Sequence, residues 1–257
     1  MLSVIIVSYN TRDLLAECLS SLNKYLPKDS EVIVVDNASE DGSVQMVRKR
    51  FPQFRLIDLY ENRGFGGANN VGACLAAGDL LWFLNSDAVL HSSPQPVLDF
   101  FAHNSVGILG TKLVDSDGTI QRYVCGSFYT LFTPLRKYLP WAPTPWKASE
   151  PRKVDWVSGA SMFVQQSVMD QLDGFDEQYF MYFEDQDLCY RAKKVGYFVY
   201  YFPFYEVEHY EGGSFSKRKD AKLLYYKTFR KFVKKTRPKW ESWLLAKLLT
   251  VWKKLLF

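Results

Sequence analysis

Three short polar segments occur along the chain in a fixed order, and each one carries at least one carboxylate. They are Asp36-Asn37-Ala38-Ser39, Asn85-Ser86-Asp87 and Glu184-Asp185-Gln186-Asp187. A carboxylate can accept hydrogen bonds from a nucleoside, bind a hard divalent cation or remove a proton from a hydroxyl group. If the three segments meet in one cleft, their chemistry predicts an enzyme that acts on a nucleotide-linked substrate.

The elements expected around these segments would bring them together. Strand-like runs alternate with amphipathic segments through the first hundred residues, which predicts an α/β fold with a mostly parallel, Rossmann-like sheet flanked by helices. The first two polar segments follow expected strands at 31–35 and 80–84, and the third opens an expected helix at 184–195. Since ligands bind beyond the carboxyl ends of the strands in such sheets, we expect Asp36 and Asp87 to lie at one edge.

The periodicity is less uniform in the rest of the chain. Further strands are expected at 2–7, 54–59 and 197–202, helices at 13–25, 39–50, 67–77 and 165–172, and a regular segment at 154–164. Residues 125–152 are rich in proline and aromatic residues, which predicts a long loop of a kind that is often functional.

Each polar segment also has a purely structural interpretation. Asp36 could close its strand in an Asx turn, and Asp87 could cap a turn. The carboxylates of Glu184 and Asp185 could complement a helix dipole. Adjacent on a helix, these two side chains are expected to point to different faces, so that only one of them serves a given site. Asp187 could form an ion pair with Arg191 one helical turn later.

Two further features could bind anions or a metal. The segment 62–70 is rich in glycine and precedes an expected helix, so its backbone could approach a phosphate. It is not a dinucleotide motif, because Asn69 takes the place of the last glycine. His209 follows the last expected strand and could join a metal shell or contact phosphate. A structural loop and a surface histidine are the respective alternatives.

Composition narrows the class of protein. The 257 residues are 47% hydrophobic, which supports a folded core rather than disorder. The four cysteines are scattered without a CxxC pair, so neither a zinc site nor a disulfide framework is expected, and a reduced, cytoplasmic compartment fits. Residues 1–7 read as a strand rather than a signal peptide, and no apolar run approaches the roughly 18 residues that span a bilayer.

The charge is unevenly distributed along the chain. Residues 217–257 carry 14 Lys and Arg against two acidic residues, whereas residues 1–216 carry 18 basic and 26 acidic residues. One face of the last segment collects Leu244, Leu245, Leu248, Leu249, Trp252, Leu255 and Leu256. A basic amphipathic helix of this kind is typical of a segment that lies on an anionic membrane surface.

We therefore expect a catalytic domain at 1–216 and a membrane-surface tail at 217–257. Packing of the tail onto the body and an oligomer interface are the alternatives. Nucleic acid is not expected as a partner, because no base-reading module accompanies the basic stretch.

Taken together, the segments resemble those of the inverting glycosyltransferases of family 2, which have the GT-A fold, and most closely the bacterial rhamnosyltransferase-like members. The resemblance covers about residues 2–215. The matching stretches are Ser3–Asn10, Val35–Ser39, Asn62–Gly72, Asn85–Ala88, Ser158–Ala160, Gly174–Glu177, Phe183–Leu188 and His209.

The resemblance implies a role for individual residues. Donor-binding residues would be Ser8, Asn10, Asp36, Arg63, Asn69, Asn85, Ser86, Gly159 and Ala160, and Trp156 would border the acceptor. Asp87 and His209 would bind Mg²⁺ or Mn²⁺, with Asn85 standing where the family's D-x-D motif has its first acid. Asp185 would be the catalytic base, with Glu184 as the alternative.

The implied reaction is metal-dependent transfer of a sugar, with inversion, from a nucleoside diphosphate donor. Thymidine diphosphate rhamnose is the expected donor and a uridine diphosphate sugar the alternative. The acceptor would be a glycan, or a polyprenyl-diphosphate-linked glycan of a cell-wall or surface-polysaccharide pathway, at the inner face of the cytoplasmic membrane. A sugar nucleotidyltransferase and a non-catalytic, membrane-bound sugar-nucleotide-binding module are the competing interpretations.

Overall fold

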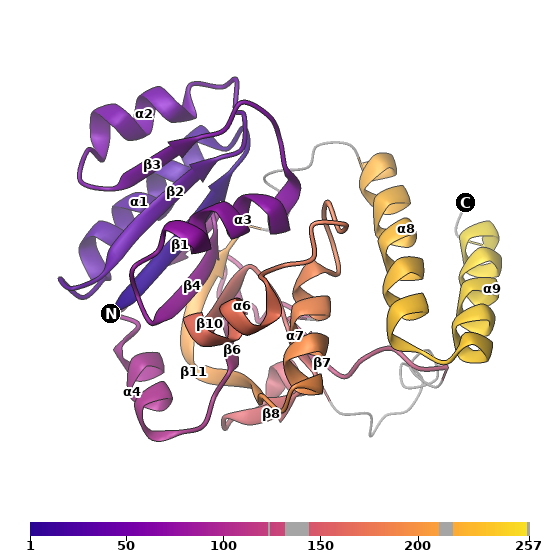
Figure 1. The fold of residues 1–257 in the computed structure, drawn as a ribbon. Helices are drawn as coiled ribbons and strands as arrows, with labels where there is room; N and C mark the ends of the chain where they lie inside the picture. Colours follow the sequence, from indigo (N-terminus) through magenta and orange to yellow (C-terminus); the bar gives the residue numbers. More distant parts are fainter. Residues whose placement is uncertain (123, 132–143, 211–217, 256–257) are drawn as a thin grey trace.

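A nine-stranded sheet with helices packed against it forms the body of the molecule (Figure 1). The structure is a computed structural model that describes residues 1–122, 124–131, 144–210 and 218–255, with the backbone alone at 218–220 and 249–255. The first half contains β1 (Leu2–Ser8), α1 (Arg12–Tyr25), β2 (Glu31–Asp36), α2 (Ser43–Arg50), β3 (Arg55–Asp58), α3 (Gly64–Leu75), β4 (Leu80–Asn85), β5 (Ala88–Leu90), α4 (Gln95–His103) and β6 (Ile108–Val114). The second half contains β7 (Cys125–Gly126), a 3₁₀ turn (Pro145–Lys147), β8 (Arg152–Val154), β9 (Trp156–Val157), β10 (Ser161–Gln165), α6 (Gln166–Leu172), α7 (Glu184–Lys194), β11 (Val199–His209), α8 (Arg218–Thr236) and α9 (Lys239–Leu255).

The sheet has the strand order β3-β2-β1-β4-β10-β6-β11-β5, and β8 pairs with β11. Six strands run in one direction, namely β3, β2, β1, β4, β6 and β11, and three run against them, namely β10, β5 and β8. The expected α/β fold with a mostly parallel sheet and flanking helices is thus confirmed. The segment 154–164 divides into the end of β8, then β9 and most of β10, and β10 inserts antiparallel between β4 and β6.

Several expected elements differ in their bounds from those observed: the helix expected at 39–50, for example, begins only at Ser43, and two other differences bear on the pocket. The expected strand at 197–202 continues to His209 as β11, because the register against β6 shifts between Phe202 and Glu206 and so accommodates Pro203 inside the strand. This extension places His209 opposite Ala88 of β5. The helix expected at 67–77 begins three residues earlier, inside the glycine-rich segment.

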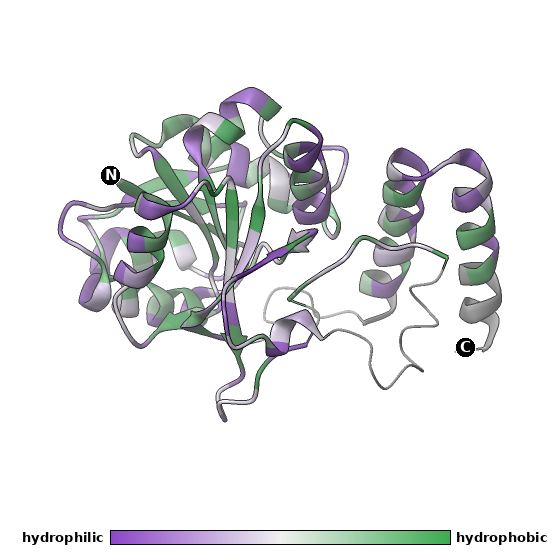
Figure 2. Cartoon of the chain, turned by 90° about the horizontal axis from the view of Figure 1, so that it is seen from below, coloured by the Kyte–Doolittle hydropathy of each residue, from purple (hydrophilic) through white to green (hydrophobic). Residues whose placement is uncertain are grey.

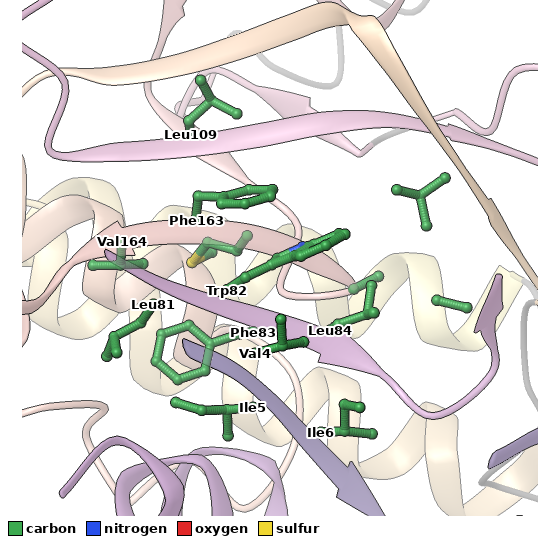
Figure 3. Packing of buried hydrophobic residues seen from close by; sticks show 14 of the residues in the cluster. Val4, Ile5, Ile6, Leu81, Trp82, Phe83, Leu84, Leu109, Phe163 and Val164 are labelled. Carbon is green, nitrogen blue, oxygen red and sulfur yellow. The ribbon is translucent and has the colours of Figure 1, made fainter. Parts of the chain in front are cut away.

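The core lies between the sheet and its helices. Val4, Ile5 and Ile6 of β1 are fully buried, and the indole of Trp82 stacks on the ring of Phe163 at a centroid distance of 4.5 Å (Figure 3). The strands are predominantly hydrophobic, whereas the helices alternate hydrophobic and hydrophilic residues (Figure 2). This is the pattern of a sheet that is covered on both faces.

Helix α8 packs back onto the body through a second hydrophobic cluster, one of the alternatives considered for the tail. The cluster consists of Tyr179, Phe183, Phe229, Phe232, Val233 and Leu245. Helix α9 lies against α8 (Figure 1). Residues 211–217, where the expected domain boundary falls, and the side chains of Leu249, Trp252, Leu255 and Leu256 lie outside the described residues.

Candidate active site

A pocket of about 420 Å³ opens beyond the carboxyl ends of β1 and β4. Nine of the predicted site residues line it: Asn85, Ser86, Asp87, Trp156, Gly159, Ala160, Glu184, Asp185 and His209. They come from strand ends, connecting loops and the start of α7. Distant parts of the chain meet here because the parallel strands end at the same edge of the sheet. Among the described lining residues, none is Lys or Arg.

Asp87 and His209 form one end of this pocket and are both largely buried. The imidazole Nε2 of His209 lies 3.4 Å from Asp87 Oδ1, and Asn85 Nδ2 donates to the same nitrogen at 3.1 Å. The backbone amide of Tyr210 donates to the carbonyl of Asp87 at 2.9 Å, which holds the two segments together.

Gln121 orients His209 and was missed by the sequence analysis. Its Nε2 donates to the His209 carbonyl and to Asp115 Oδ1, both at 2.7 Å. Its Oε1 must therefore accept the proton of His209 Nδ1 at 2.9 Å. In the neutral imidazole that hydrogen bond places the proton on Nδ1 and leaves the lone pair of Nε2 facing Asp87, as a metal-binding imidazole requires.

A divalent cation fits this end of the pocket only if substrate phosphates and water supply some of its ligands. Asp87 and the unprotonated Nε2 of His209 offer two donors. The described residues contain no group of three or more His, Cys, Asp or Glu that could hold an ion without help. Mg²⁺ and Mn²⁺ can be bound by one or two protein ligands together with water and substrate phosphates.

Glu184 and Asp185 line the same pocket, so the expectation that only one of them lies at a given site is wrong. They stand at the first turn of α7, and Phe183 before them adopts a left-handed backbone conformation that turns the helix start toward the pocket. Asp185 Oδ2 accepts a hydrogen bond from the Gly159 amide at 3.1 Å, and Oδ1 accepts one from the Gln186 amide at 2.7 Å. Oε2 of Glu184 has no hydrogen-bond partner among the described residues.

The two carboxyl groups differ in their electrostatics. Burial raises the pKa of Asp185, and the amides of Gly159 and Gln186 partly oppose that rise. Burial raises the pKa of Glu184 well above its usual range, and the neighbouring charge of Asp185 raises it further. The backbone amides thus favour the charged form of Asp185, whereas the charge of Asp185 favours the neutral form of Glu184.

The backbone before the two carboxylates is strained. Tyr182 and Phe183 both have positive φ, 69° and 71°, although neither is a glycine. The segment lies against the start of α3, where the Phe65 amide donates to the Phe180 carbonyl at 3.0 Å. Gly64 permits this approach, because a Cβ there would meet the Phe180 carbonyl oxygen at 2.2 Å.

The residues predicted for the nucleoside lie beside the pocket rather than in its lining. Ser8 and Asp36 are paired across β1 and β2, and both are buried. Asp36 Oδ2 accepts from the Ser39 amide at 2.8 Å, whereas Oδ1 has no partner among the described residues. Burial raises the pKa of Asp36. Asn10 has a φ of 55°, and its Oδ1 accepts from the Glu40 amide at 2.8 Å.

Arg63 and Asn69 hold structure in place and do not line the pocket. Arg63 forms a half-exposed ion pair with Glu177 at 3.2 Å. Asn69 is buried in α3, and its Nδ2 donates to the Phe65 carbonyl at 2.9 Å.

Other residues complete the lining, among them Tyr9, Asn37, Asn62, Tyr129, Phe180, Tyr182 and Tyr225. Asn37 could have been inferred from its position next to Asp36. No pattern in the sequence points to Tyr225, which lies in the basic tail.

Residues 3–163 match the family model described as Glycosyl transferase family 2. Over 242 residues the chain is 31% identical to N-acetylglucosaminyl-diphospho-decaprenol L-rhamnosyltransferase of Mycobacterium tuberculosis, covering 83% of this chain and 77% of the relative. It is 25% identical over 254 residues to the rhamnosyltransferase WbbL of Escherichia coli, covering 92% and 91% of the two chains.

Solved structures share the fold at low sequence identity. A mannosyltransferase from Pyrobaculum calidifontis, in complex with GDP-Man and Mn²⁺, aligns with a TM-score of 0.65 and 19% identity, over 96% of this chain and 68% of its own. Staphylococcus aureus TarS aligns with a TM-score of 0.63 and 20% identity, over 93% of this chain and 40% of its own. With a family match over more than half its length and a rhamnosyltransferase relative that covers most of it, the chain belongs to glycosyl transferase family 2 and has the GT-A fold.

Proposed function

We propose that the protein transfers a sugar, with inversion, from a nucleoside diphosphate donor to a hydroxyl group of a glycan acceptor. One observation carries the proposal: the Asp87–His209 pair and the Asp185 carboxylate share one pocket. The turn at 159–160 connects them, since the Ala160 carbonyl accepts from the Asn85 amide at 3.0 Å and the Gly159 amide binds Asp185. A cation site and a base are the two parts that such a displacement needs.

The donor would lie across the ends of β1, β2 and β4. The unpartnered Oδ1 of Asp36 suits an N–H or O–H group of a nucleoside, with Ser8 and Asn10 beside it. No described lining residue is cationic, so the charge of a diphosphate has no counterion among the described residues of the pocket. Mg²⁺ or Mn²⁺ held by Asp87 and His209 would supply that charge and stabilise the leaving diphosphate.

Asp185 is the proposed base. Two backbone amides hold the Asp185 carboxylate and favour its charged form, so Asp185 is the carboxylate placed to accept the proton of the acceptor hydroxyl. The acceptor oxygen attacks the anomeric carbon from the face opposite the diphosphate, the bond to the diphosphate breaks, and the configuration inverts. The Gly159 amide holds Asp185 Oδ2 in place during this step.

The donor and acceptor classes are proposed from the relatives. The names of the two rhamnosyltransferase relatives support rhamnose as the transferred sugar. We propose thymidine diphosphate rhamnose as the donor, with a uridine diphosphate sugar as the alternative. The mycobacterial relative is named for an N-acetylglucosaminyl-diphospho-decaprenol substrate, which favours a lipid-linked acceptor. The protein would then act in the cytoplasm, on the inner face of the membrane.

Release of nucleoside diphosphate tests the function. Purified protein is incubated with a panel of sugar nucleotides in Mn²⁺, Mg²⁺ or EDTA, with and without a synthetic lipid-diphosphate N-acetylglucosamine. We expect metal-dependent release from one donor, and Asp185→Asn is expected to keep donor binding while losing at least about 100-fold in rate. Pyrophosphate release from a nucleoside triphosphate and a sugar phosphate, or wild-type turnover by Asp185→Asn, would contradict the proposal.

A further inference from the structure

The contacts around the pocket arrange its residues in a definite order. Asp87 and His209 form the first end, and Asn85 connects them through its amide to the Ala160 carbonyl. The next residue along this path is Asp185, which is bound to the Gly159 amide. Beyond Asp185 lie Tyr182 and Phe183, whose rings contact Tyr225 of α8. The proposed base therefore stands between a polar, cation-binding end and an aromatic end.

The aromatic end is built from three separate parts of the chain. Tyr129, Tyr182 and Tyr225 line the pocket there. Tyr182 and Tyr225 meet edge to face at a centroid distance of 5.7 Å, and the hydroxyl groups of Tyr129 and Tyr225 lie 3.4 Å apart. These side chains offer ring faces and phenolic hydroxyls, but no positive charge.

This chemistry selects a class of ligand. A diphosphate would need cations, and the described lining of the pocket has none. A pyranose ring presents apolar C–H groups on one face and hydroxyls on its rim, which match aromatic rings and phenol groups. The base requires such a hydroxyl within hydrogen-bond reach.

We infer that Tyr225, with Tyr182 and Tyr129, forms a subsite for the pyranose ring of the acceptor, so that α8 of the basic tail is part of the acceptor site. The inference rests on the proposed function and adds to it the residues that bind the acceptor sugar. It also accounts for the packing of α8 against the segment before Glu184, since that packing brings Tyr225 to the pocket.

Binding of simple sugars tests the subsite independently of turnover. Saturation-transfer NMR, with irradiation of the aromatic protein resonances, is recorded on wild-type protein with methyl glycosides of glucose, N-acetylglucosamine, galactose and rhamnose. We expect at least one pyranoside to receive signal on its C–H face. Tyr225→Leu, which keeps apolar volume against Phe183, is expected to abolish most of this signal, and Tyr225→Phe to retain part of it.

Two variants control for the packing of the helix. Tyr226→Leu alters the next residue of α8, which does not line the pocket, and should leave the signal unchanged. Tyr182→Leu removes a subsite ring from outside α8 and should reduce the signal. The absence of signal from every pyranoside, or equal signals in Tyr225→Leu and Tyr226→Leu, would overturn the inference.

Kinetics separate this inference from the proposed function. In the coupled assay, Tyr225→Leu should raise the KM for the lipid-diphosphate N-acetylglucosamine probe about tenfold, whereas Tyr226→Leu should leave that KM within about twofold of wild type. An unchanged KM would overturn the subsite while leaving the transferase intact. Tyr225-dependent sugar binding without nucleoside diphosphate release from any donor would instead contradict the proposed function alone.

Discussion

Glu184 and Asp185 are neighbours in the chain whose carboxyl groups share a pocket but differ in their hydrogen bonds. Asp185 accepts two backbone hydrogen bonds, and Glu184 has an oxygen without a partner among the described residues. Burial raises the pKa of both groups; the backbone amides oppose the rise for Asp185, and the charge of Asp185 adds to it for Glu184. Neighbouring groups whose environments separate their pKa values are typical of acid–base sites.

Glu184→Gln is expected to stabilise the protein at neutral and alkaline pH. The folded pKa of Glu184 lies above its unfolded value of about 4.3, so the stability that this carboxyl contributes is complete below that value and is lost as the pH rises through the folded pKa. The amide imitates the protonated acid and avoids the loss. We expect a gain on the order of 1 kcal/mol, or about 2–4 °C in Tm, at pH 8.

Thermal unfolding between pH 4 and pH 8 measures this difference. The gain should shrink toward pH 4, and the surface variant Glu61→Gln should show no such trend. A Glu184→Gln protein that is less stable than wild type at pH 8 would show that the carboxylate is stabilised in the fold.

At the level of elements, α8 is held to α7, which carries the proposed base, by charge as well as by apolar packing. Lys235 Nζ lies 2.7 Å from Asp187 Oδ1 and 2.9 Å from Asp176 Oδ2. Asp187 is fully buried and also pairs with Arg191 at 2.7 Å, as predicted from their spacing. A buried carboxylate of this kind needs its cations, because water cannot replace them.

Lys235→Met is expected to destabilise the protein by about 1–3 kcal/mol, because it removes one cation from Asp187 and one from Asp176; partial exposure of Lys235 moderates the loss. Lys234→Met, on the same helix but facing the groove toward α9, is the matched control. Thermal unfolding of the two variants gives the comparison. Equal Tm values for both would show that the ion pairs do not hold α8.

At the level of the whole molecule, α9 presents an apolar and basic surface away from the body. Trp240, Trp243 and Leu248 are all more than 40% exposed, and the ammonium group of Lys247 lies 3.8 Å from the ring centre of Trp243. None of the described helices is both long and apolar enough to cross a bilayer. We propose that this surface rests on an anionic membrane.

Vesicle co-sedimentation tests that proposal. The protein should bind phosphatidylglycerol vesicles and bind phosphatidylcholine vesicles weakly. The double variant Trp240→Ser, Trp243→Ser should lose about tenfold in affinity, because it removes two interfacial anchors. Donor hydrolysis in solution should be unchanged, and Tyr60→Ser, which alters a 92% exposed aromatic residue outside the tail, is the control. Equal binding by both variants would exclude α9 as the anchor.

Sequence patterns were enough to predict the fold class and the family. Alternating apolar runs predicted the strands of the first hundred residues, because burial on both faces leaves few other ways to arrange them. The polar residues Asp36 and Asp87 could be placed at one edge for the same reason, since parallel strands end together. Local pattern thus accounts for the sheet and for the polar end of the pocket.

Which side chains meet depends instead on contacts between distant parts of the chain. Gln121 fixes the His209 tautomer across 88 residues of chain, and no local pattern encodes that contact. Glu184 reaches the pocket beside Asp185 because the strained backbone at Phe183 sets the start of α7. Helical periodicity in the sequence does not predict such a turn. Tyr225 belongs to the pocket because α8 packs against Phe183, a contact between residues far apart in the chain that depends on shape rather than on composition.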